Sequence, residues 1–453
     1  MDTIAAIATA QGQGGIGVIR VSGDDAIELV DKIFKSISNK KLIETPGYQA
    51  RFGKIYDKDE EIDECVVLVY RTPHSYTGED VVEISCHGGI YITKRILRLL
   101  FEKGAKPAQP GEFTKRAFLN GKMDLIKAES VMNLIGATGK CAAKAAIAVH
   151  EGLISKKIIS AKDELVNLAA LLTVWADYPD EDIPEVKFNS IKEKLLSIKK
   201  DLMHLVESYD FGKVMTNGIE TAIIGAPNVG KSTLMNMLAG IDKSIVTDIP
   251  GTTRDIVEEN VTLGDIVLHI SDTAGIRNTN DPVESIGVDK AKSKLRSSEL
   301  ILLVFDGSKK LSDEDKKLIN SVDNDNVVVI VNKSDLKQQL DCEYIKKYHS
   351  RIVYISAKNR VGFNELEENI LQVIGVEKFN PSEGILATER QYILVKNSID
   401  ALDEAIDALV NGLTLDAVTV SVESAIDELL SLTGEKANTV VVDEVFSKFC
   451  VGK

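Results

Sequence analysis

One stretch constrains this chain more than any other, because residues 219–232 read IETAIIGAPNVGKS. An apolar strand-type run enters the pattern Gly-x-x-x-x-Gly-Lys-Ser, and the helical sequence TLMNMLAG follows directly. A phosphate chain needs inward-facing backbone N–H groups with a helix N-terminus behind them, which a glycine-rich loop between strand and helix provides. The stretch therefore predicts a phosphate-binding loop in which Lys231 neutralises the outer phosphates and Ser232 offers its hydroxyl to Mg²⁺. The expected nucleotide contacts in this loop are Asn228, Val229, Gly230, Lys231, Ser232 and Thr233.

The pattern of apolar residues divides the 453-residue chain into four segments. Strand-type and helical runs alternate through residues 216–378, which predicts a doubly wound, mainly parallel sheet. Residues 1–121 mix strand-type runs such as GVIRVSG with short helical runs, which predicts an α+β domain. Helical spacing at 122–215 returns at 379–453, so we expect the α/β domain to be inserted into a helical domain.

Three further motifs follow strand-type runs in the order that a guanine-nucleotide switch requires. DTAG at 272–275 follows HIS, where a carboxylate can orient Mg²⁺ and a glycine N–H can contact the γ-phosphate. NKSD at 332–335 ends VVVIV, and its aspartate can accept both hydrogen bonds from the N1–H and 2-amino edge of guanine, which adenine lacks. SAK at 356–358 closes the next strand and can cover the base, so the four motifs predict GTP and not ATP. The expected contacts here are Asp272, Thr273, Ala274, Gly275, Asn332, Lys333, Asp335, Ser356, Ala357 and Lys358.

The segment IVTDIPGTTRD at 245–255 lies where a switch loop should bring a threonine to Mg²⁺, and Thr253 is the candidate. The expected nucleotide contacts in it are Thr247, Asp248, Ile249, Pro250, Gly251, Thr252 and Thr253.

The residues leave open how the attacking water is held. Ras-like switches carry a glutamine after DTAG, whereas this chain has Ile276, which cannot orient a water. Glu284 could hold the water, or it could be an acid that favours the start of a helix. Asn228 could place its amide oxygen on a monovalent cation beside the phosphates, and Arg254 and Arg277 are the competing sources of positive charge.

Composition excludes several classes of protein. The formal net charge of −15 argues against a chain that coats nucleic acid or membrane by charge alone. Five cysteines without a CxxC pair argue against disulfides and structural zinc, and no apolar run spans a bilayer. We therefore expect a cytoplasmic protein without a membrane partner. The GxGxxG run at 12–17 precedes a strand and not the helix of a dinucleotide site, and His87 and Trp175 are expected to be packing residues.

Together these motifs make the chain closely similar to the MnmE (TrmE) family of tRNA-modification GTPases over nearly its full length. In the N-terminal domain the resemblance depends on GGIGVIRVSG, SYTGEDVVEISCHGG and PGEFTKRAFLNGKMDL. In the α/β domain it depends on GAPNVGKS, IVTDIPGTTRD, DTAGIR followed by VESIGVDKA, and NKSD, and at the end on FCVGK. The nucleotide motifs fit many bacterial GTPases, whereas the N-terminal blocks and the CxGK ending are more specific. The resemblance implies a Ras-like GTPase domain and a folate-binding-like N-terminal domain.

The resemblance also implies a function. Family members are potassium-dependent GTPases that work with the flavoprotein MnmG, in a heterotetramer, to build aminomethyl or carboxymethylaminomethyl groups at carbon 5 of the tRNA wobble uridine. The resemblance implies a homodimer held by the N-terminal domains, and G domains that meet across their nucleotide faces. It makes Glu284 the water-orienting acid and gives Mg²⁺ to Ser232 and Thr253. It assigns the potassium site to Asn228, Thr247, Ile249 and Thr252.

A tetrahydrofolate derivative is the implied one-carbon donor, with contacts that map onto Arg20, Glu83, Lys122 and Lys453. Cations suit the folate carboxylates, and a carboxylate suits the amino edge of the pterin. Cys450 could be a nucleophile near the transferred carbon or a buried thiol, and the absence of a base in the sequence favours the second. The alternative function is a ribosome-assembly or other RNA-linked regulatory GTPase switch, which would use the same G motifs but would not need the N-terminal blocks.

Overall fold

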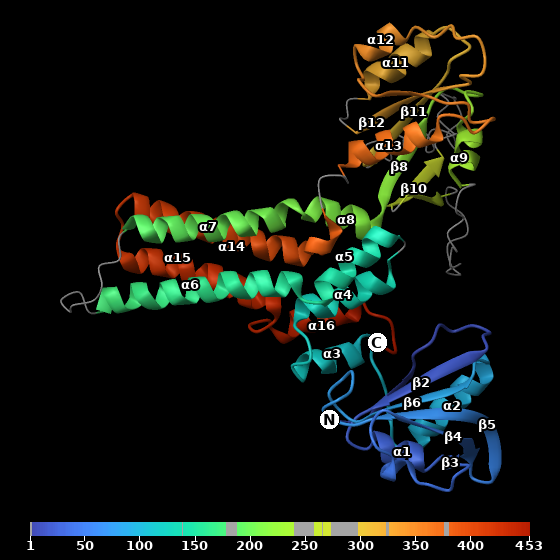
Figure 1. The fold of residues 1–453 in the computed structure, drawn as a ribbon, viewed down its shortest axis with the longest axis vertical. Helices are drawn as coiled ribbons and strands as arrows, with labels where there is room; N and C mark the ends of the chain where they lie inside the picture. Colours follow the sequence, from blue (N-terminus) through green and yellow to red (C-terminus); the bar gives the residue numbers. More distant parts are fainter. Residues whose placement is uncertain are drawn as a thin grey trace, which may run out of the picture. The chain divides into compact units, whose positions relative to one another are not determined.

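Figure 1 shows the fold of the chain in the computed structural model. The chain folds into two compact units. This division is coarser than the four segments expected from the sequence, which stay a prediction. One unit comprises Met1–Met132, Ser155–Leu195 and Asp400–Lys453, and the other comprises Asn133–Ile154 and Leu196–Ile399. The structure describes residues 2–137, 139–177, 188–239, 258–264, 266–272, 298–322, 326–375 and 380–453.

The N-terminal part of the first unit contains a seven-stranded sheet in the order β3-β4-β5-β6-β2-β1-β7. Neighbouring strands run antiparallel, apart from β1 and β7, which are parallel. The α+β prediction for this segment is confirmed. The strands are β1 (Ile4–Ile7), β2 (Ile16–Ser22), β3 (Phe34–Ser36), β4 (Gln49–Asp57), β5 (Glu60–Tyr70), β6 (Val81–His87) and β7 (Lys106–Pro107).

Alternation along β2 gives the sheet two different faces. Ile19 and Val21 are fully buried on one face, where they join a core that includes Ile96 and Leu100 of helix α2 (Ile90–Glu102). Because successive side chains of a strand point to opposite faces, Arg20 lies on the other face. Because the first face is buried in the core, a binding site on this sheet can form only on the face that carries Arg20. Helix α1 (Ala26–Asp31) and the short 3₁₀ helix η1 (Leu42–Glu44) complete this part of the unit.

The end of the chain packs onto the N-terminal region. Phe446 of helix α16 (Thr439–Ser447) is buried with Leu125 of helix α4 (Leu125–Ile135). Gly452 has φ +98°, and a Cβ there would lie 2.5 Å from the Ile7 carbonyl oxygen. This close approach places the last residues of the chain against β1 in a conformation that favours glycine.

Long amphipathic helices make up most of the remaining helical segments, as the sequence predicts. In α14, Val395, Leu402 and Ala405 are fully buried at spacings that recur on one helix face. The helices are α3 (Glu112–Leu119), α5 (Lys140–His150), α6 (Leu153–Asp177), α7 (Phe188–Glu207), α8 (Tyr209–Asn217), α14 (Glu389–Val410) and α15 (Leu415–Thr433).

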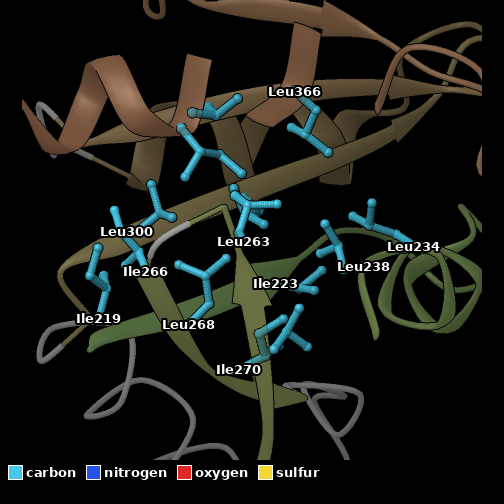
Figure 2. Close-up of a cluster of buried hydrophobic side chains, with 14 of the residues drawn as sticks. Ile219, Ile223, Leu234, Leu238, Leu263, Ile266, Leu268, Ile270, Leu300 and Leu366 are labelled. Atoms are coloured by element: carbon cyan, nitrogen blue, oxygen red, sulfur yellow. The ribbon is translucent and has the colours of Figure 1, made fainter. Parts of the chain in front are cut away.

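The second unit holds a six-stranded sheet in the order β13-β12-β11-β8-β10-β9, in which only β9 runs antiparallel to its described neighbour. Leu302 of β11 points into one apolar cluster, shown in Figure 2, while Ile301 and Leu303 point into a second. Cores on both faces confirm the doubly wound, mainly parallel sheet. The strands are β8 (Ile219–Ile224), β9 (Glu258–Leu263), β10 (Ile266–Asp272), β11 (Leu300–Asp306), β12 (Val327–Asn332) and β13 (Ile352–Tyr354). The helices around them are α9 (Lys231–Ala239), α11 (Asp313–Ser321), α12 (Cys342–Lys346) and α13 (Phe363–Ile374), while the 3₁₀ helix η3 (Pro381–Glu383) contacts α5.

Candidate functional site

The loop between β8 and α9 has a backbone that its sequence explains. A Cβ on Gly225 would lie 2.2 Å from the Val304 carbonyl oxygen, and one on Gly230 would lie 2.2 Å from Nδ2 of Asn332. Gly230 and Asn228 both have positive φ, at 102° and 63°. Glycine is therefore required where the loop approaches β11 and β12, and Asn228 tolerates the left-handed conformation better than most residues.

The side chains expected to meet phosphates lie at the start of α9. The Lys231 ammonium donates hydrogen bonds to the carbonyls of Gly225 at 2.8 Å and Ala226 at 3.1 Å, so it lies across the loop. Ser232 and Thr233 are exposed in the first helical turn. This arrangement places a cation, two hydroxyls and a helix N-terminus together, which suits a phosphate chain and its Mg²⁺.

Asn332 at the end of β12 forms hydrogen bonds with three loops. Its Nδ2 donates to the Val229 carbonyl at 2.9 Å, and its Oδ1 accepts from the backbone N–H groups of Lys333 at 2.8 Å and Ala357 at 3.0 Å. The side chain is almost fully buried. The NKSD and SAK motifs are thereby held beside the phosphate loop, at the edge where the parallel strands end.

Asp335 is exposed and lies beside Ser356 of the SAK motif. A hydrogen bond from the buried Ser356 side chain lowers the pKa of the Asp335 carboxyl, and Lys358 adds to the effect. An aspartate is already ionised at neutral pH, and the lowered pKa favours the ionised, hydrogen-bond-accepting form further. Asp335 is therefore in the protonation state that guanine recognition needs.

Part of the expected nucleotide site lies outside the described residues. Asp272 ends β10 on the same edge of the sheet, although its side chain is not described. The catalytic candidate Glu284, the DTAG residues Thr273, Ala274 and Gly275, and Ile276, Arg254 and Arg277 fall outside. So do the switch-loop residues Thr247, Asp248, Ile249, Pro250, Gly251, Thr252 and Thr253.

The N-terminal candidates come from distant parts of the chain, and three of them meet. Arg20 on β2 and Glu83 on β6 are directly opposite each other, and Nε of Arg20 donates to Oε1 of Glu83 at 2.9 Å. The Arg20 guanidinium also donates to the Gly452 carbonyl at 3.2 Å. Burial lowers the pKa of the Lys453 ammonium, and nearby Arg20 lowers it further while Glu83 opposes the shift. Lys122 donates to the Pro73 carbonyl at 3.0 Å.

Aromatic residues that the sequence did not reveal surround this cluster. The Arg20 guanidinium lies 5.5 Å from the ring centroid of Tyr76 and 5.6 Å from that of Phe113. The Tyr70 hydroxyl donates to Glu83 at 3.4 Å. Two basic side chains and one carboxylate beside aromatic faces make a site that suits a flat molecule with acidic groups.

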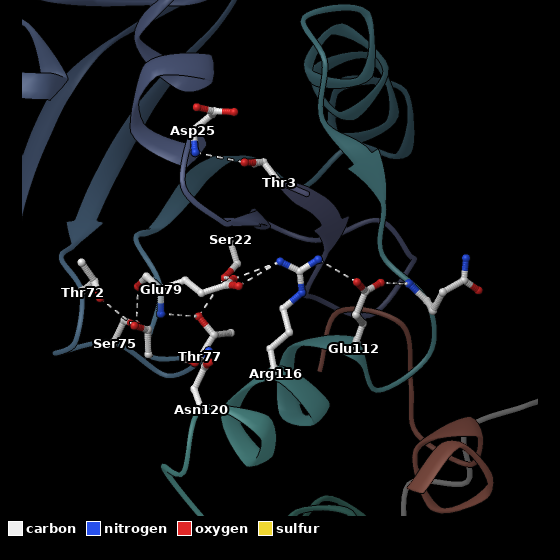
Figure 3. A network of polar contacts seen from close by, with 12 residues as sticks. Thr3, Ser22, Asp25, Thr72, Ser75, Thr77, Glu79, Glu112, Arg116 and Asn120 are labelled. Atoms are coloured by element: carbon white, nitrogen blue, oxygen red, sulfur yellow. Dashed lines mark hydrogen bonds and ion pairs between the residues drawn. The ribbon is translucent and has the colours of Figure 1, made fainter. Parts of the chain in front are cut away.

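A buried polar network supports helix α3, which carries Phe113 (Figure 3). Arg116 donates to both carboxylate oxygens of Glu79, at 3.1 and 3.0 Å, and to Glu112 at 2.8 Å. The Ser22 hydroxyl donates to Glu79 at 2.7 Å. The network joins β2, the loop before β6 and α3, and the pairs that Glu79 makes with Arg116 and Ser22 are too far apart in the sequence for a local pattern to predict them.

Family comparisons match this organisation along the whole chain. The family described as "GTP-binding protein TrmE N-terminus" matches residues 3–122, and "MnmE helical domain" matches residues 125–450. The chain is 42% identical to the tRNA modification GTPase MnmE of Clostridioides difficile over 456 aligned residues, covering 100% of this chain and 99% of that protein. The chain belongs to the MnmE family of tRNA modification GTPases.

Further MnmE relatives are similar to this chain over its whole length. The MnmE proteins of Alkaliphilus metalliredigens and Lactobacillus acidophilus are 40% and 41% identical to this chain, covering all of it and 99% and 98% of their own lengths. A solved structure of Era from Aquifex aeolicus matches 40% of this chain and 66% of its own length at 26% identity, with a TM-score of 0.29. Membership in the MnmE family makes this chain a GTP-hydrolysing enzyme of tRNA modification.

Two expectations outside the nucleotide site are wrong. Cys450 of this MnmE family member is exposed and not buried, because the chain end lies along the N-terminal domain instead of entering the helical core. The His87 side chain is 72% exposed and not packed. Its Nδ1 lies 2.6 Å from Oδ1 of Asp63. Among the described residues, no helix is both long and apolar enough to cross a membrane.

Proposed function

We propose that this chain is a potassium-dependent GTPase that, with a flavoprotein partner of the MnmG type, installs aminomethyl or carboxymethylaminomethyl groups at carbon 5 of the tRNA wobble uridine. The observation that carries the proposal is the presence of two sites on one chain. One is the phosphate loop tied to the NKSD motif by Asn332, and the other is the Arg20–Glu83–Lys453 cluster. A regulatory switch for ribosome assembly needs the first site and has no use for the second.

In the nucleotide site, GTP would be recognised through its base and its phosphates. Asp335 would accept the N1–H and 2-amino hydrogens of guanine, with Ser356, Ala357 and Lys358 beside the base. Lys231 would neutralise the outer phosphates, and Ser232 would bind Mg²⁺ together with Thr253. The exposed hydroxyl of Ser232 at a helix N-terminus supports this assignment.

Potassium would lie beside the phosphates, held by Asn228 with Thr247, Ile249 and Thr252. The left-handed backbone of Asn228 supports this proposal, because it turns the loop at the residue that would supply the side-chain oxygen. The cation would neutralise charge that develops during hydrolysis, in place of an arginine side chain. Glu284 would orient the attacking water.

The N-terminal cluster would hold a tetrahydrofolate derivative as the one-carbon donor. The basic side chains of Arg20 and Lys453 suit the glutamate carboxylates, and Glu83 suits the amino edge of the pterin. Lys122 would add a third cation. Bound there, the folate would supply the one-carbon unit, while this chain's residues would orient it against Tyr76 and Phe113.

The N-terminal sheet also supports a homodimer. Phe52 and Val66 lie directly opposite each other on β4 and β5, with 50% and 41% of their surface exposed, and Ile16 on β2 is 67% exposed. Exposed apolar side chains on a sheet face are typical of a protein–protein contact. In this proposal two copies of the chain pair through the N-terminal domains, bind the flavoprotein partner in a heterotetramer and act on tRNA in the cytoplasm.

The test is mass spectrometry of tRNA nucleosides from cells that lack this protein. We expect the C5-aminomethyl uridine derivatives to disappear, to return with the wild-type gene and to stay absent with Glu284→Ala. Glu314→Ala is the matched control, because Glu314 is an exposed acid in the first turn of α11, and it should restore the nucleosides fully. Unchanged nucleosides in the deletion strain, without a second gene copy, would overturn the proposal.

A further inference from the structure

A buried carboxylate lies beside the nucleotide site without belonging to any of its motifs. Asp306 ends β11 directly opposite Asn332 of β12, and only 5% of the residue is exposed. A buried anion next to a phosphate-binding loop repels the ligand, and its burial is unfavourable unless it is paired. Its position therefore needs an explanation.

Both carboxylate oxygens of Asp306 have hydrogen-bond partners, and the exposed Lys309 ammonium also lies 4.0 Å from Oδ2. Oδ2 accepts a hydrogen bond from the Lys333 ammonium at 2.6 Å, while Oδ1 accepts from the backbone N–H of Ser308 at 3.0 Å and from its hydroxyl at 2.6 Å. Burial alone would raise the pKa of the Asp306 carboxyl, but the bonds from Lys333 and Ser308 outweigh it and the pKa is lowered. The carboxylate is thus ionised and fixed in direction by Ser308.

Lys333 in turn connects two strained parts of the nucleotide site. Its ammonium also donates to the Asn228 carbonyl at 3.1 Å, so the NKSD motif is bonded to the phosphate loop. Lys333 and Asn228 both have left-handed backbones, with φ of 64° and 63°. A non-glycine residue keeps this conformation only where the surrounding contacts hold it.

The structure assigns Asp306 as a positioning residue for nucleotide binding: it holds the Lys333 ammonium over the phosphate loop and so joins guanine recognition to the conformation of Asn228. Without the carboxylate, the partner that remains for the flexible lysine side chain among the described residues is the neutral Asn228 carbonyl. The inference depends on the guanine-nucleotide site alone and not on the modification chemistry, so the tests of the two are independent.

A purely electrostatic role for Asp306 makes the opposite prediction. If Asp306 only reduced the positive charge near the phosphates, removing it would free the Lys333 cation and tighten nucleotide binding. If Asp306 positions Lys333, removing it weakens binding, and the effect depends on Lys333 being present. A double-mutant cycle separates these two cases.

The experiment measures the Kd of fluorescent N-methylanthraniloyl-GDP for the full chain with Mg²⁺ present. We expect Asp306→Asn to raise Kd by about tenfold, the size of one charge-assisted hydrogen bond. Lys333→Met should raise Kd at least as much, and the double variant should match Lys333→Met alone. Asp313→Asn is the matched control, because the Asp313 side chain is 94% exposed at the start of α11, and Kd should not change.

Ser308→Ala provides a milder test should Asp306→Asn fail to fold. It removes one donor to Asp306 and should raise Kd about threefold in the wild-type background and not in the Lys333→Met background. Tighter binding by Asp306→Asn, a Kd within twofold of wild type, or equal effects of Asp306→Asn with and without Lys333 would overturn the inference. Equal effects of Ser308→Ala in both backgrounds would do the same.

Discussion

The nucleotide site and the N-terminal cluster are built in opposite ways. In the G domain, the phosphate loop, Asn332 and Ser356 each lie at the end of a strand of one parallel sheet, and these strand ends bring them together. In the N-terminal domain, Arg20 and Glu83 project from the middle of antiparallel strands, and Lys453 arrives from the end of the chain. Short contiguous motifs therefore describe the first site, whereas only the fold assembles the second.

The largest expected effect tests whether the N-terminal cluster depends on its buried support. Arg116→Met leaves the Glu79 carboxylate buried without its cation, which should destabilise this domain by about 3–5 kcal/mol. Hydrogen exchange of the β2 and β6 amides in the full chain measures the loss. Arg98→Met is the control, because the Arg98 side chain is 83% exposed, and it should leave exchange unchanged. Unchanged exchange in Arg116→Met would show that the network contributes nothing to stability.

The second prediction separates the two sites by removing Lys231, the cation proposed to bind the outer phosphates. Lys231→Ala should weaken GTP binding at least about 100-fold, or about 2.7 kcal/mol, because a cation close to the outer phosphates is lost. Tetrahydrofolate binding should not change. Calorimetric titration of both ligands measures this, with the exposed Lys310→Ala as control. Loss of both ligands together would mean that the sites are not independent.

The third prediction is the reverse experiment. Arg20→Gln should weaken tetrahydrofolate binding about tenfold through loss of a charge-assisted bond, while GTP affinity stays the same. Arg98→Gln is the matched control on the same domain. Tetrahydrofolate affinity equal to wild type in Arg20→Gln would remove the reason for calling the cluster a folate site.

The sequence reveals the nucleotide motifs because each is a contiguous run after a strand. The sequence does not reveal the role of Asp306, because an acidic residue after an apolar run is typical of an ordinary strand end. Arg20 and Glu83 are 63 residues apart, and only the family resemblance indicates that they are site residues. The aromatic partners Tyr76 and Phe113 had no local signal, because their proximity to Arg20 depends on α3 packing against β1. The exposure of Cys450 depends likewise on where the chain end lies.

Cysteine reactivity tests this placement of the chain end. Burial raises the pKa of Cys65 to about 12 and that of Cys86 to about 11, so neither forms much thiolate at pH 8. Cys450 is exposed. Mass spectrometry after iodoacetamide treatment of the native protein should find Cys450 alkylated and the other two intact. Protection of Cys450 in the monomeric chain would contradict its exposure.

The smallest expected effect concerns the exposed pair on the N-terminal sheet. The hydrogen bond that the His87 ring donates to the Asp63 carboxylate raises the pKa of His87 above its ordinary value. The pair therefore stabilises the fold below the unfolded pKa of histidine, and this contribution is lost as pH rises through the raised value. NMR titration should show the pKa of His87 falling in Asp63→Asn, and an unchanged titration would exclude the pairing.

The most direct test of the account asks whether both sites serve one reaction. Cells lacking the protein would be complemented with wild type, Lys231→Ala or Arg20→Gln, and their tRNA nucleosides measured by mass spectrometry. We expect Lys231→Ala to fail to restore the C5-aminomethyl uridine derivatives and Arg20→Gln to restore less of them than wild type, although each keeps the ligand of the other site. Full restoration by Arg20→Gln, in a protein shown to bind tetrahydrofolate more weakly than wild type, would contradict the account.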